Sequence, residues 1–231
     1  MITTDNLSVG YGSPILENVN LALGSGCLTC LVGVNGSGKS TLIRTLAGLQ
    51  KPLSGFVCCE GERIDQMTRQ RLSQLVSVVL TDPLTDSLMT VGELVASGRM
   101  PYTGFLGGLS DSDRAIVDAA MERLDVSQLA GRHLSQISDG QRQRALIARA
   151  IAQQTPVLML DEPTAFLDFR SRAQVMQLLR DLAHKEGKSV LCSTHELDLA
   201  GRFGDVFWTV DGGGVVVMDK EEFVSVFFKD Q

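Results

Sequence analysis

The sequence predicts an α/β protein with a core built on a parallel sheet, into which a helical segment is inserted. Short apolar runs typical of buried strands occur at residues 27–32, 75–80, 157–160 and 189–193. Between residues 85 and 155 the apolar residues recur mainly at helical spacing instead. A strand-rich chain interrupted by one helical region is most simply explained by a helical insertion within a parallel α/β core.

The first of these runs leads directly into a glycine-rich loop. Gly33 to Thr41 reads GVNGSGKST and matches the pattern G-x-x-x-x-G-K-[ST]. Leu42, Ile43 and Leu46 then recur at helical spacing. Strand, loop and helix in this order favour a phosphate-binding P-loop over a glycine turn that holds Lys-Ser by chance. The glycines let backbone N–H groups face an anion, and the helix adds the positive end of its dipole.

A second phosphate-handling element follows the apolar run at 157–160, where Asp161 and Glu162 come next. Ligands of open parallel sheets bind beyond the carboxyl ends of the strands. In this interpretation Lys39 reaches the β- and γ-phosphates, and Ser40 and Asp161 hold Mg²⁺. Glu162 polarises the water that attacks the γ-phosphate. An acidic turn after a core strand is the alternative, which the P-loop in the same chain disfavours.

A third element is a helix start at Ser138-Asp-Gly-Gln141, ahead of a helical run that extends to Ile151. Ser138 is a good N-cap, and Gly140 allows close approach of another backbone. Taken alone, the tetrapeptide indicates only a helix cap. If this helix start and the P-loop serve one nucleotide, we expect them to come from two copies of the protein.

With these motifs in this order, the chain resembles the ATP-binding subunits of ABC transporters over roughly residues 1–210. The resemblance implies a P-loop NTPase (RecA-like) core with an inserted α-helical subdomain and an N-terminal antiparallel β portion. It implies one ATP-binding domain over residues 1–231. The nucleotide-binding core would comprise 1–84 and 156–231, and the helical subdomain 85–155 would carry the signature motif.

The resemblance also implies roles for individual residues. Tyr11 stands where an aromatic ring stacks on adenine, residues 165–168 match the D-loop at the dimer interface, and His195 matches the switch histidine at the γ-phosphate. The predicted catalytic residues are Glu162, His195 and Lys39, and the predicted metal ligands are Ser40, Asp161 and Thr81. The residues expected to bind the nucleotide are Tyr11, Gly33, Asn35, Gly36, Ser37, Gly38, Lys39, Ser40, Thr41, Ser138, Gly140 and Gln141.

Two positions depart from the family pattern. Thr81 occupies the place of the Q-loop glutamine, and its shorter side chain weakens hydrolysis or coupling unless Asp82 or a water substitutes. Asp139 replaces a signature glycine near the phosphates, where a carboxylate opposes ATP unless it points outward. Because neither change removes Lys39, Asp161 or Glu162, we expect an active ATPase.

The expected function is that of an ATP-hydrolysing subunit with ATP and Mg²⁺ as cofactors. Two copies would pair head-to-tail, trap two Mg·ATP and drive integral-membrane permease subunits, served indirectly by a substrate-binding protein. Residues 90–102 and 193–200 resemble importers of ferric siderophores, haem and cobalamin. Two alternatives stay open: a soluble ABC ATPase acting in translation or DNA repair, and an ATP-dependent regulator with slow turnover.

Composition is consistent with this function. A net charge of −6 gives no support to nucleic-acid binding through bulk charge. No apolar run approaches the roughly 20 residues that cross a bilayer, and the N-terminus lacks signal-peptide character. We expect a cytoplasmic protein that is peripheral on the inner face of the membrane. The five cysteines, including the Cys27/Cys30 pair, are expected to be buried, small hydrophobic residues in a reducing compartment.

Overall fold

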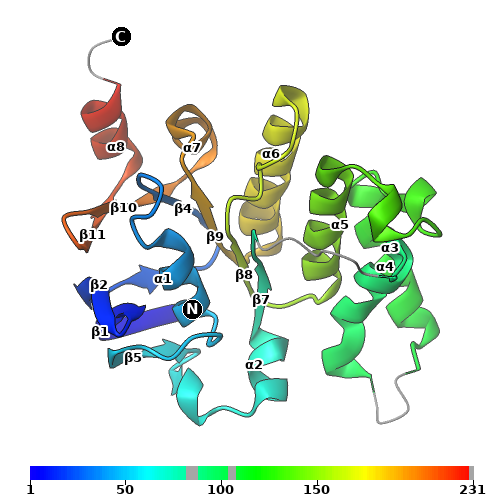
Figure 1. Ribbon diagram of the computed structural model, residues 1–231, viewed down its shortest axis with the longest axis horizontal. Coiled ribbons are helices and arrows are strands. Elements are labelled where there is room, and N and C mark those ends of the chain that lie inside the picture. Colours follow the sequence, from blue (N-terminus) through cyan, green and yellow to red (C-terminus); the bar gives the residue numbers. More distant parts are fainter. Residues whose placement is uncertain (82–87, 104–107, 229–231) are drawn as a thin grey trace.

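The computed structural model describes residues 1–81, 88–103 and 108–228, which fold into two sheets with helices between and around them (Figure 1). The strands are β1 (Ile2–Tyr11), β2 (Ser13–Val19), β3 (Ala22–Leu23), β4 (Leu28–Val32), β5 (Ser54–Cys59), β6 (Glu62–Arg63), β7 (Val76–Val79), β8 (Val157–Leu160), β9 (Ser189–Thr194), β10 (Val206–Asp211) and β11 (Gly214–Met218). The α-helices are α1 (Lys39–Leu46), α2 (Arg69–Leu75), α3 (Val91–Ala96), α4 (Asp111–Arg123), α5 (Asp139–Ala152), α6 (Phe169–Glu186), α7 (Leu197–Phe203) and α8 (Lys220–Phe227). Short 3-10 helices are η1 (Ile64–Gln66), η2 (Ser97–Tyr102), η3 (Ser127–Leu129) and η4 (Leu134–Gln136).

The central sheet has the strand order β11-β10-β4-β9-β8-β7. Neighbouring strands from β10 to β7 are parallel, and β11 pairs antiparallel with β10 as a hairpin. Every residue of β4, β8 and β9 is buried. Continuous burial of this kind is typical of parallel strands that are covered on both faces, so the predicted parallel core is confirmed.

One face of this sheet packs on α1, which lies between the central sheet and the N-terminal sheet (Figure 1). The N-terminal sheet has the order β2-β1-β5-β6 with β3 beside β1, and all of its pairs are antiparallel. It is the antiparallel β portion implied by the resemblance. The apolar side chains shared by these three layers include Leu7, Val9, Leu16, Leu31, Leu42, Ile43, Leu46, Met159, Leu191 and Trp208.

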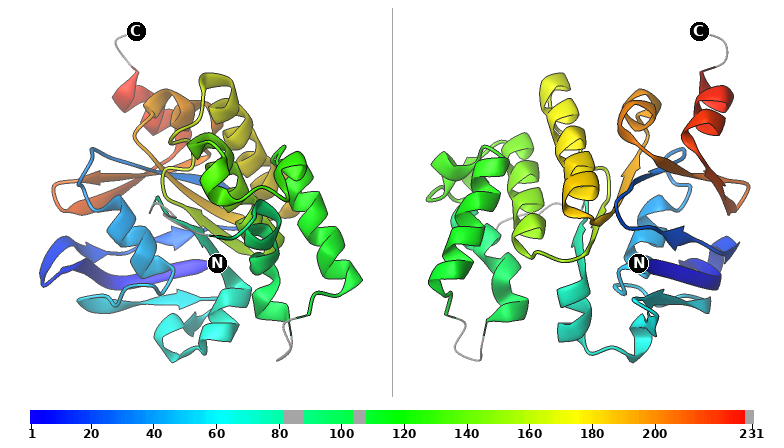
Figure 2. Two further views of the ribbon diagram at one scale, coloured as in Figure 1. Left: turned by 45° about the vertical axis from the view of Figure 1, so that its right-hand side comes forward. Right: turned by 180° about the vertical axis from the view of Figure 1, so that it is seen from behind.

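The other face packs on α5 to α8. Leu158 and Leu160 alternate with Met159, so β8 serves both cores with a period of two residues. The C-terminal helix α8 is anchored by Phe223, whose ring stacks on Phe207 at a centroid distance of 3.9 Å. Helices α3, α4 and α5 gather at the side opposite the N-terminal sheet, as both views of Figure 2 show.

Several predicted elements have shifted boundaries. The strand expected at 75–80 is β7, and it starts one residue later because Leu75 ends helix α2. Helix α5 starts at Asp139 with the predicted N-cap Ser138, and it ends at Ala152, one residue beyond the expected Ile151. Helix α4 is capped by Ser110, whose hydroxyl accepts a hydrogen bond from the Asp113 amide.

The cysteine prediction is only partly right. Cys30, Cys59 and Cys192 are buried, but Cys27 and Cys58 are partly exposed. Cys27 lies just before β4, and Cys58 alternates along β5 with the buried Val57 and Cys59. Burial raises the pKa of the Cys30 thiol to about 12, which makes it unreactive. Among the described residues, no group of three or more His, Cys, Asp or Glu side chains forms a metal site, and no helix has the length and apolar character needed to span a membrane.

The helical elements are joined to one another through η2. Arg99 is buried, and its Nε donates to Oδ1 of Asp113 at 2.8 Å while a terminal nitrogen donates to the Ala152 carbonyl at 2.9 Å. One residue earlier, a Cβ on Gly98 would lie 2.3 Å from the carbonyl oxygen of Arg149. Gly98 therefore allows η2 and α5 to approach with backbone against backbone.

We expect Gly98→Ala to lower the free energy of unfolding by about 1–3 kcal/mol, because a methyl group must push two backbone segments apart. Urea unfolding followed by circular dichroism measures the change. Gly131→Ala is the matched control, because a Cβ there meets no heavy atom within 4 Å. Equal stability of the two variants would contradict the close-approach explanation.

Candidate functional site

The loop between β4 and α1 curls around its own lysine. Nζ of Lys39 donates hydrogen bonds to the carbonyl oxygens of Gly33 at 2.8 Å and Val34 at 3.0 Å, and Lys39 is only 5% exposed. Gly36 and Gly38 have φ angles of 79° and 104°, in the region that glycine adopts more readily than any other residue. The residues predicted to form a P-loop therefore form a tight left-handed turn onto the start of α1.

This turn offers hydrogen-bond donors to an anion. The N-cap of α1 is Gly38, which has no side chain to accept from the amides of the first turn. The Ser37 hydroxyl is buried without a hydrogen-bond partner in the described part of the chain. Uncapped amides, the positive helix end and an unsatisfied hydroxyl together fit a polyphosphate.

Three of the predicted site residues directly follow parallel strands. Gly33 follows β4, Asp161 follows β8 and His195 follows β9. In the register of these strands Val32 pairs with Thr194, so the loops after β4 and β9 leave the sheet side by side. The sheet thus brings Lys39's loop, the acidic pair and the histidine to one edge, which is the ligand-binding edge of open α/β sheets.

Asp161 is held from both sides. It is 2% exposed, and its Oδ1 accepts a hydrogen bond from the Ser193 hydroxyl at 2.6 Å. Its Oδ2 lies 3.1 Å from the hydroxyl of Thr81. Thr81, predicted as a metal ligand, is therefore in contact with another predicted ligand. Ser193 had no predicted role, and only its place two residues before His195 could have suggested one.

Glu162 and His195 face each other, with 3.4 Å between Oε1 and Nδ1. The Glu162 amide donates to the Ser193 hydroxyl at 2.9 Å, and its φ of 47° is left-handed. A non-glycine residue in this conformation costs about 1–2 kcal/mol. The two side chains are 24% and 55% exposed, so water reaches them.

The groups present fit a magnesium ion that arrives with a nucleotide. The exposed Ser40 hydroxyl and the Asp161 carboxylate are hard oxygen donors of the kind Mg²⁺ prefers. A site with one carboxylate rather than a cluster of acids suits a cation that also binds phosphate oxygens and waters. Asp82, the alternative to Thr81, lies outside the described residues.

Residues 137–141, which resemble the family's signature motif and are called the signature segment, form a capping box at the start of α5. The Gln141 amide donates to the Ser138 hydroxyl at 3.3 Å, and the Gln141 side chain accepts from the Ser138 amide at 3.0 Å. A Cβ on Gly140 would lie 2.9 Å from the carbonyl oxygen of Phe166. The glycine therefore lets the signature segment touch the loop before α6, a contact that sequence analysis did not predict.

Asp139 is neutralised within its own helix. Its Oδ1 accepts from Arg142 at 2.8 Å, and a second Arg142 nitrogen donates to the Leu134 carbonyl at 3.0 Å. The two residues are three apart on α5, so this ion pair follows from helical spacing. The acidic substitution in the signature thus comes with a positive partner.

The signature segment and the P-loop occupy different places on the chain. Ser138, Gly140 and Phe166 line one recess, whereas Gly33, Asn35 and His195 line another. Helices α1 and α5, which carry the two motifs, stand apart in every view of Figures 1 and 2.

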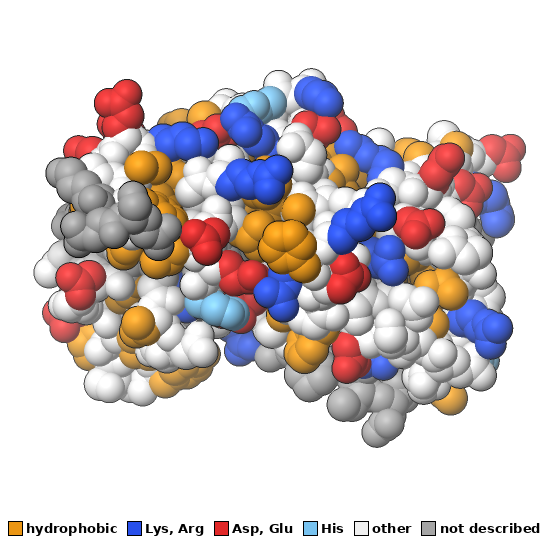
Figure 3. Space-filling view, turned by 90° about the horizontal axis from the view of Figure 1, so that it is seen from above, with side chains coloured by type: hydrophobic (Ala, Val, Ile, Leu, Met, Phe, Trp, Pro, Cys, Tyr) orange, Lys and Arg blue, Asp and Glu red, His pale blue; other side chains and the backbone are white. Residues whose placement is uncertain are grey.

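Tyr11 ends β1 and is 65% exposed, so one flat face is available for stacking. The following strand β2 passes close to the P-loop, since a Cβ on Gly38 would lie 2.8 Å from Ile15. On the face shown in Figure 3, basic and acidic side chains are mixed around an apolar centre.

Comparison with known proteins agrees with this geometry. The model of the ABC transporter family matches residues 16–165. An ABC transporter ATP-binding protein of Methanocaldococcus jannaschii is 39% identical over 206 residues, which cover 89% of this chain and 71% of that protein. The iron(3+)-hydroxamate import ATP-binding protein of Bacillus subtilis is 35% identical over 216 residues, 93% of this chain and 80% of that protein. The cobalamin import ATP-binding protein of Halobacterium salinarum is 41% identical over 204 residues, which cover 88% of this chain but only 51% of that protein.

Solved structures give the same assignment. The dimeric ABC transporter cassette MJ0796 superposes with a TM-score of 0.85 and 28% identity, covering 95% of this chain and 99% of the cassette. The post-hydrolysis form of the same cassette, bound to ADP and Pi, has a TM-score of 0.85 and 27% identity, with the same coverage. The chain therefore belongs to the ABC transporter family, as one of its ATP-hydrolysing cassettes.

Proposed function

We propose that this cassette powers a membrane importer whose cargo is a metal chelate of the iron-siderophore, haem or cobalamin type. The observation that carries the ATPase role is the meeting of Lys39, Asp161, Glu162 and His195 at one edge of the sheet. The cargo class is supported by the relatives named for iron(3+)-hydroxamate import and cobalamin import.

In the proposed mechanism the chain's own groups position the reactants. Backbone amides of the P-loop and the Lys39 ammonium bind the β- and γ-phosphates. Glu162 orients and deprotonates the attacking water, and His195, 3.4 Å from Glu162, donates toward the γ-phosphate. When bound, Mg²⁺ held by Ser40 and Asp161 offsets the charge that develops on the phosphate oxygens. Tyr11 stacks on adenine.

The recess lined by Ser138, Gly140 and Phe166 is called the signature recess. It would complete the nucleotide site of a second copy of the chain, not the site of its own copy. Ser138 and Gly140 lie in a recess apart from their own P-loop, yet the exposed start of α5 offers amides to an anion. A head-to-tail dimer places this helix start over the partner's nucleotide. Because Arg142 pairs with Asp139, the partner's phosphates meet a neutralised carboxylate.

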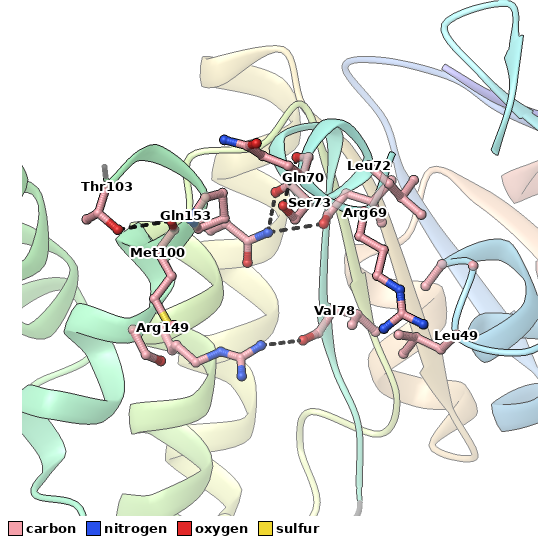
Figure 4. Close-up of a pocket in the computed structure, with 15 residues that line it drawn as sticks. Leu49, Arg69, Gln70, Leu72, Ser73, Val78, Met100, Thr103, Arg149 and Gln153 are labelled. Carbon is pink, nitrogen blue, oxygen red and sulfur yellow. Dashed lines mark hydrogen bonds between the residues drawn. The ribbon is translucent and has the colours of Figure 1, made fainter. Parts of the chain in front are cut away.

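A membrane permease would bind the cleft shown in Figure 4. Leu49, Arg69 and Leu72 line it on the core side, and Met100 and Arg149 on the helical side. Among the residues that the structure describes, those lining the cleft include arginines but no Asp or Glu. Exposed apolar side chains, beside arginines that form no ion pair with a described residue, fit an amphipathic segment that carries an acidic residue. Docking there makes the subunit peripheral on the cytoplasmic face of the membrane, with a substrate-binding protein acting on the opposite side.

We expect Glu162→Gln to lower the rate of ATP hydrolysis about 100-fold or more, since an amide cannot take the proton of the attacking water. Steady-state phosphate release measures the rate, and light scattering follows ATP-dependent dimerisation, which the variant keeps. Glu122→Gln, an exposed change on α4, is the matched control. If the wild-type protein turns over no faster than Glu162→Gln, even with its partner, the chain is a nucleotide switch and not an ATPase.

Mixing two inactive variants tests the composite site. Lys39→Ala removes the phosphate-binding ammonium, and Ser138→Arg places an exposed bulky side chain in the signature recess. A head-to-tail dimer of one of each has one intact site, whereas a site built within one chain has none. We therefore expect the mixture to trap ATP and hydrolyse it faster than either variant alone. A mixture as inactive as its components would refute the head-to-tail arrangement.

Charge reversal tests the cleft. We expect Arg69→Glu to reduce recovery of permease about tenfold in a pull-down from solubilised membranes of the source organism, because it repels an acidic segment. Lys51→Glu reverses an exposed charge that does not line the cleft and serves as control. Mass spectrometry identifies the captured protein. Recovery of ribosomes or repair proteins by the unaltered chain would favour a soluble ABC ATPase instead.

A further inference from the structure

The Asp161 carboxylate is fixed by two hydroxyl groups from different strands. Ser193, near the end of β9, donates to Oδ1 at 2.6 Å. Thr81, just beyond β7, lies at 3.1 Å from both Oδ2 and the carbonyl oxygen of Asp161. A carboxylate with one partner on each oxygen cannot rotate without losing a hydrogen bond.

The position of Thr81 follows from the sheet. Val79 pairs with Leu160 in the parallel register of β7 and β8, and the Asp161 amide donates to the Val79 carbonyl at 2.8 Å. These contacts carry the chain beyond β7 past the backbone of Asp161. Thr81 therefore contacts Asp161 through the same strand pair that builds the core.

Hydroxyl chemistry suits this place. A threonine hydroxyl has one proton to donate and two lone pairs. Its proton is shared between two oxygens of Asp161, and Thr81 itself is exposed. Because the threonine side chain is short, its hydroxyl contacts Asp161 and extends no farther. A longer amide side chain at the same position would extend past this contact.

We propose that Thr81 is a positioning residue, which holds the Asp161 carboxylate in the orientation that binds the divalent cation of Mg·ATP. This inference rests on the proposed ATPase function. It assigns to Thr81 an action through Asp161, in place of the direct metal contact that the sequence suggested.

The experiment compares Thr81→Val, which keeps the shape but removes the hydroxyl, with Thr81→Ser, which keeps the hydroxyl. Mn²⁺ binding to the complex with a non-hydrolysable ATP analogue is measured by electron paramagnetic resonance. The affinity for the analogue is measured separately in EDTA. Loss of a group that orients a metal ligand typically weakens metal binding about 10- to 100-fold. We expect that loss for Thr81→Val, near wild-type binding for Thr81→Ser, and unchanged metal-free affinity for both.

Controls separate this role from general destabilisation. Thr3→Val makes the same chemical change on β1, where the Thr3 side chain forms no hydrogen bond with any residue that the structure describes. Urea midpoints identify any variant that fails to fold, and Thr81→Ala is then used in place of Thr81→Val. The cation concentration needed for half-maximal hydrolysis is measured alongside the maximal rate. If Thr81 positions Asp161, Thr81→Val raises this concentration.

Three outcomes would overturn the inference. Wild-type Mn²⁺ affinity in Thr81→Val shows that the hydroxyl is dispensable, and equal loss in Thr81→Ser shows that the methyl group matters instead. Binding restored by Thr81→Gln but not by Thr81→Ser shows direct ligation by this position. If the unaltered chain binds Mn²⁺ with the analogue but never hydrolyses ATP, the proposed function fails while the role of Thr81 is still measurable.

Discussion

The register of the parallel strands β4, β9 and β8 is the constraint on which the site depends. Each of these strands is buried along its whole length, so a shift by one residue would exchange the side chains that face the two cores. Because the strands are parallel, their carboxyl ends must meet at one edge. The P-loop, the acidic pair and His195 come together there because each begins where a buried strand ends.

The helical elements depend on a different kind of contact. Gly98 and Arg99 sit together in η2: the glycine removes a Cβ that would collide with the Arg149 backbone, and the arginine bonds Asp113 and the Ala152 carbonyl. Burying an ion pair such as Arg99 and Asp113 costs desolvation free energy. We infer that this pair is retained because it fixes the geometry of η2 against α4. As a result η2 is held against α5, and Met100 and Arg149 from these two elements line the helical side of the cleft shown in Figure 4.

Much of this arrangement could be predicted from sequence, because strong local patterns carry it. The P-loop, the run at 157–160 and the cap at Ser138 each combine hydrophobic periodicity with turn or cap residues. The boundary at Leu75 was wrong because an apolar residue suits the end of α2 as well as the start of β7. The contacts of Thr81 and Ser193 with Asp161 join residues about 80 and 32 positions apart, so only the strand order reveals them.

The two departures from the family pattern have a common physical resolution. At each, a side chain that would disturb or weaken the site is paired within the same chain: Asp139 with Arg142, three residues along the helix, and Thr81 with Asp161, across two strands. The first pairing removes net charge where phosphates must approach, and the second supplies a hydrogen bond where a longer side chain is missing. Arg149 also donates to the Val78 carbonyl at 3.4 Å, one residue before Val79, whose carbonyl accepts from the Asp161 amide. A protein that binds the cleft would therefore lie against Val78, on the strand whose next residue accepts a hydrogen bond from the Asp161 amide.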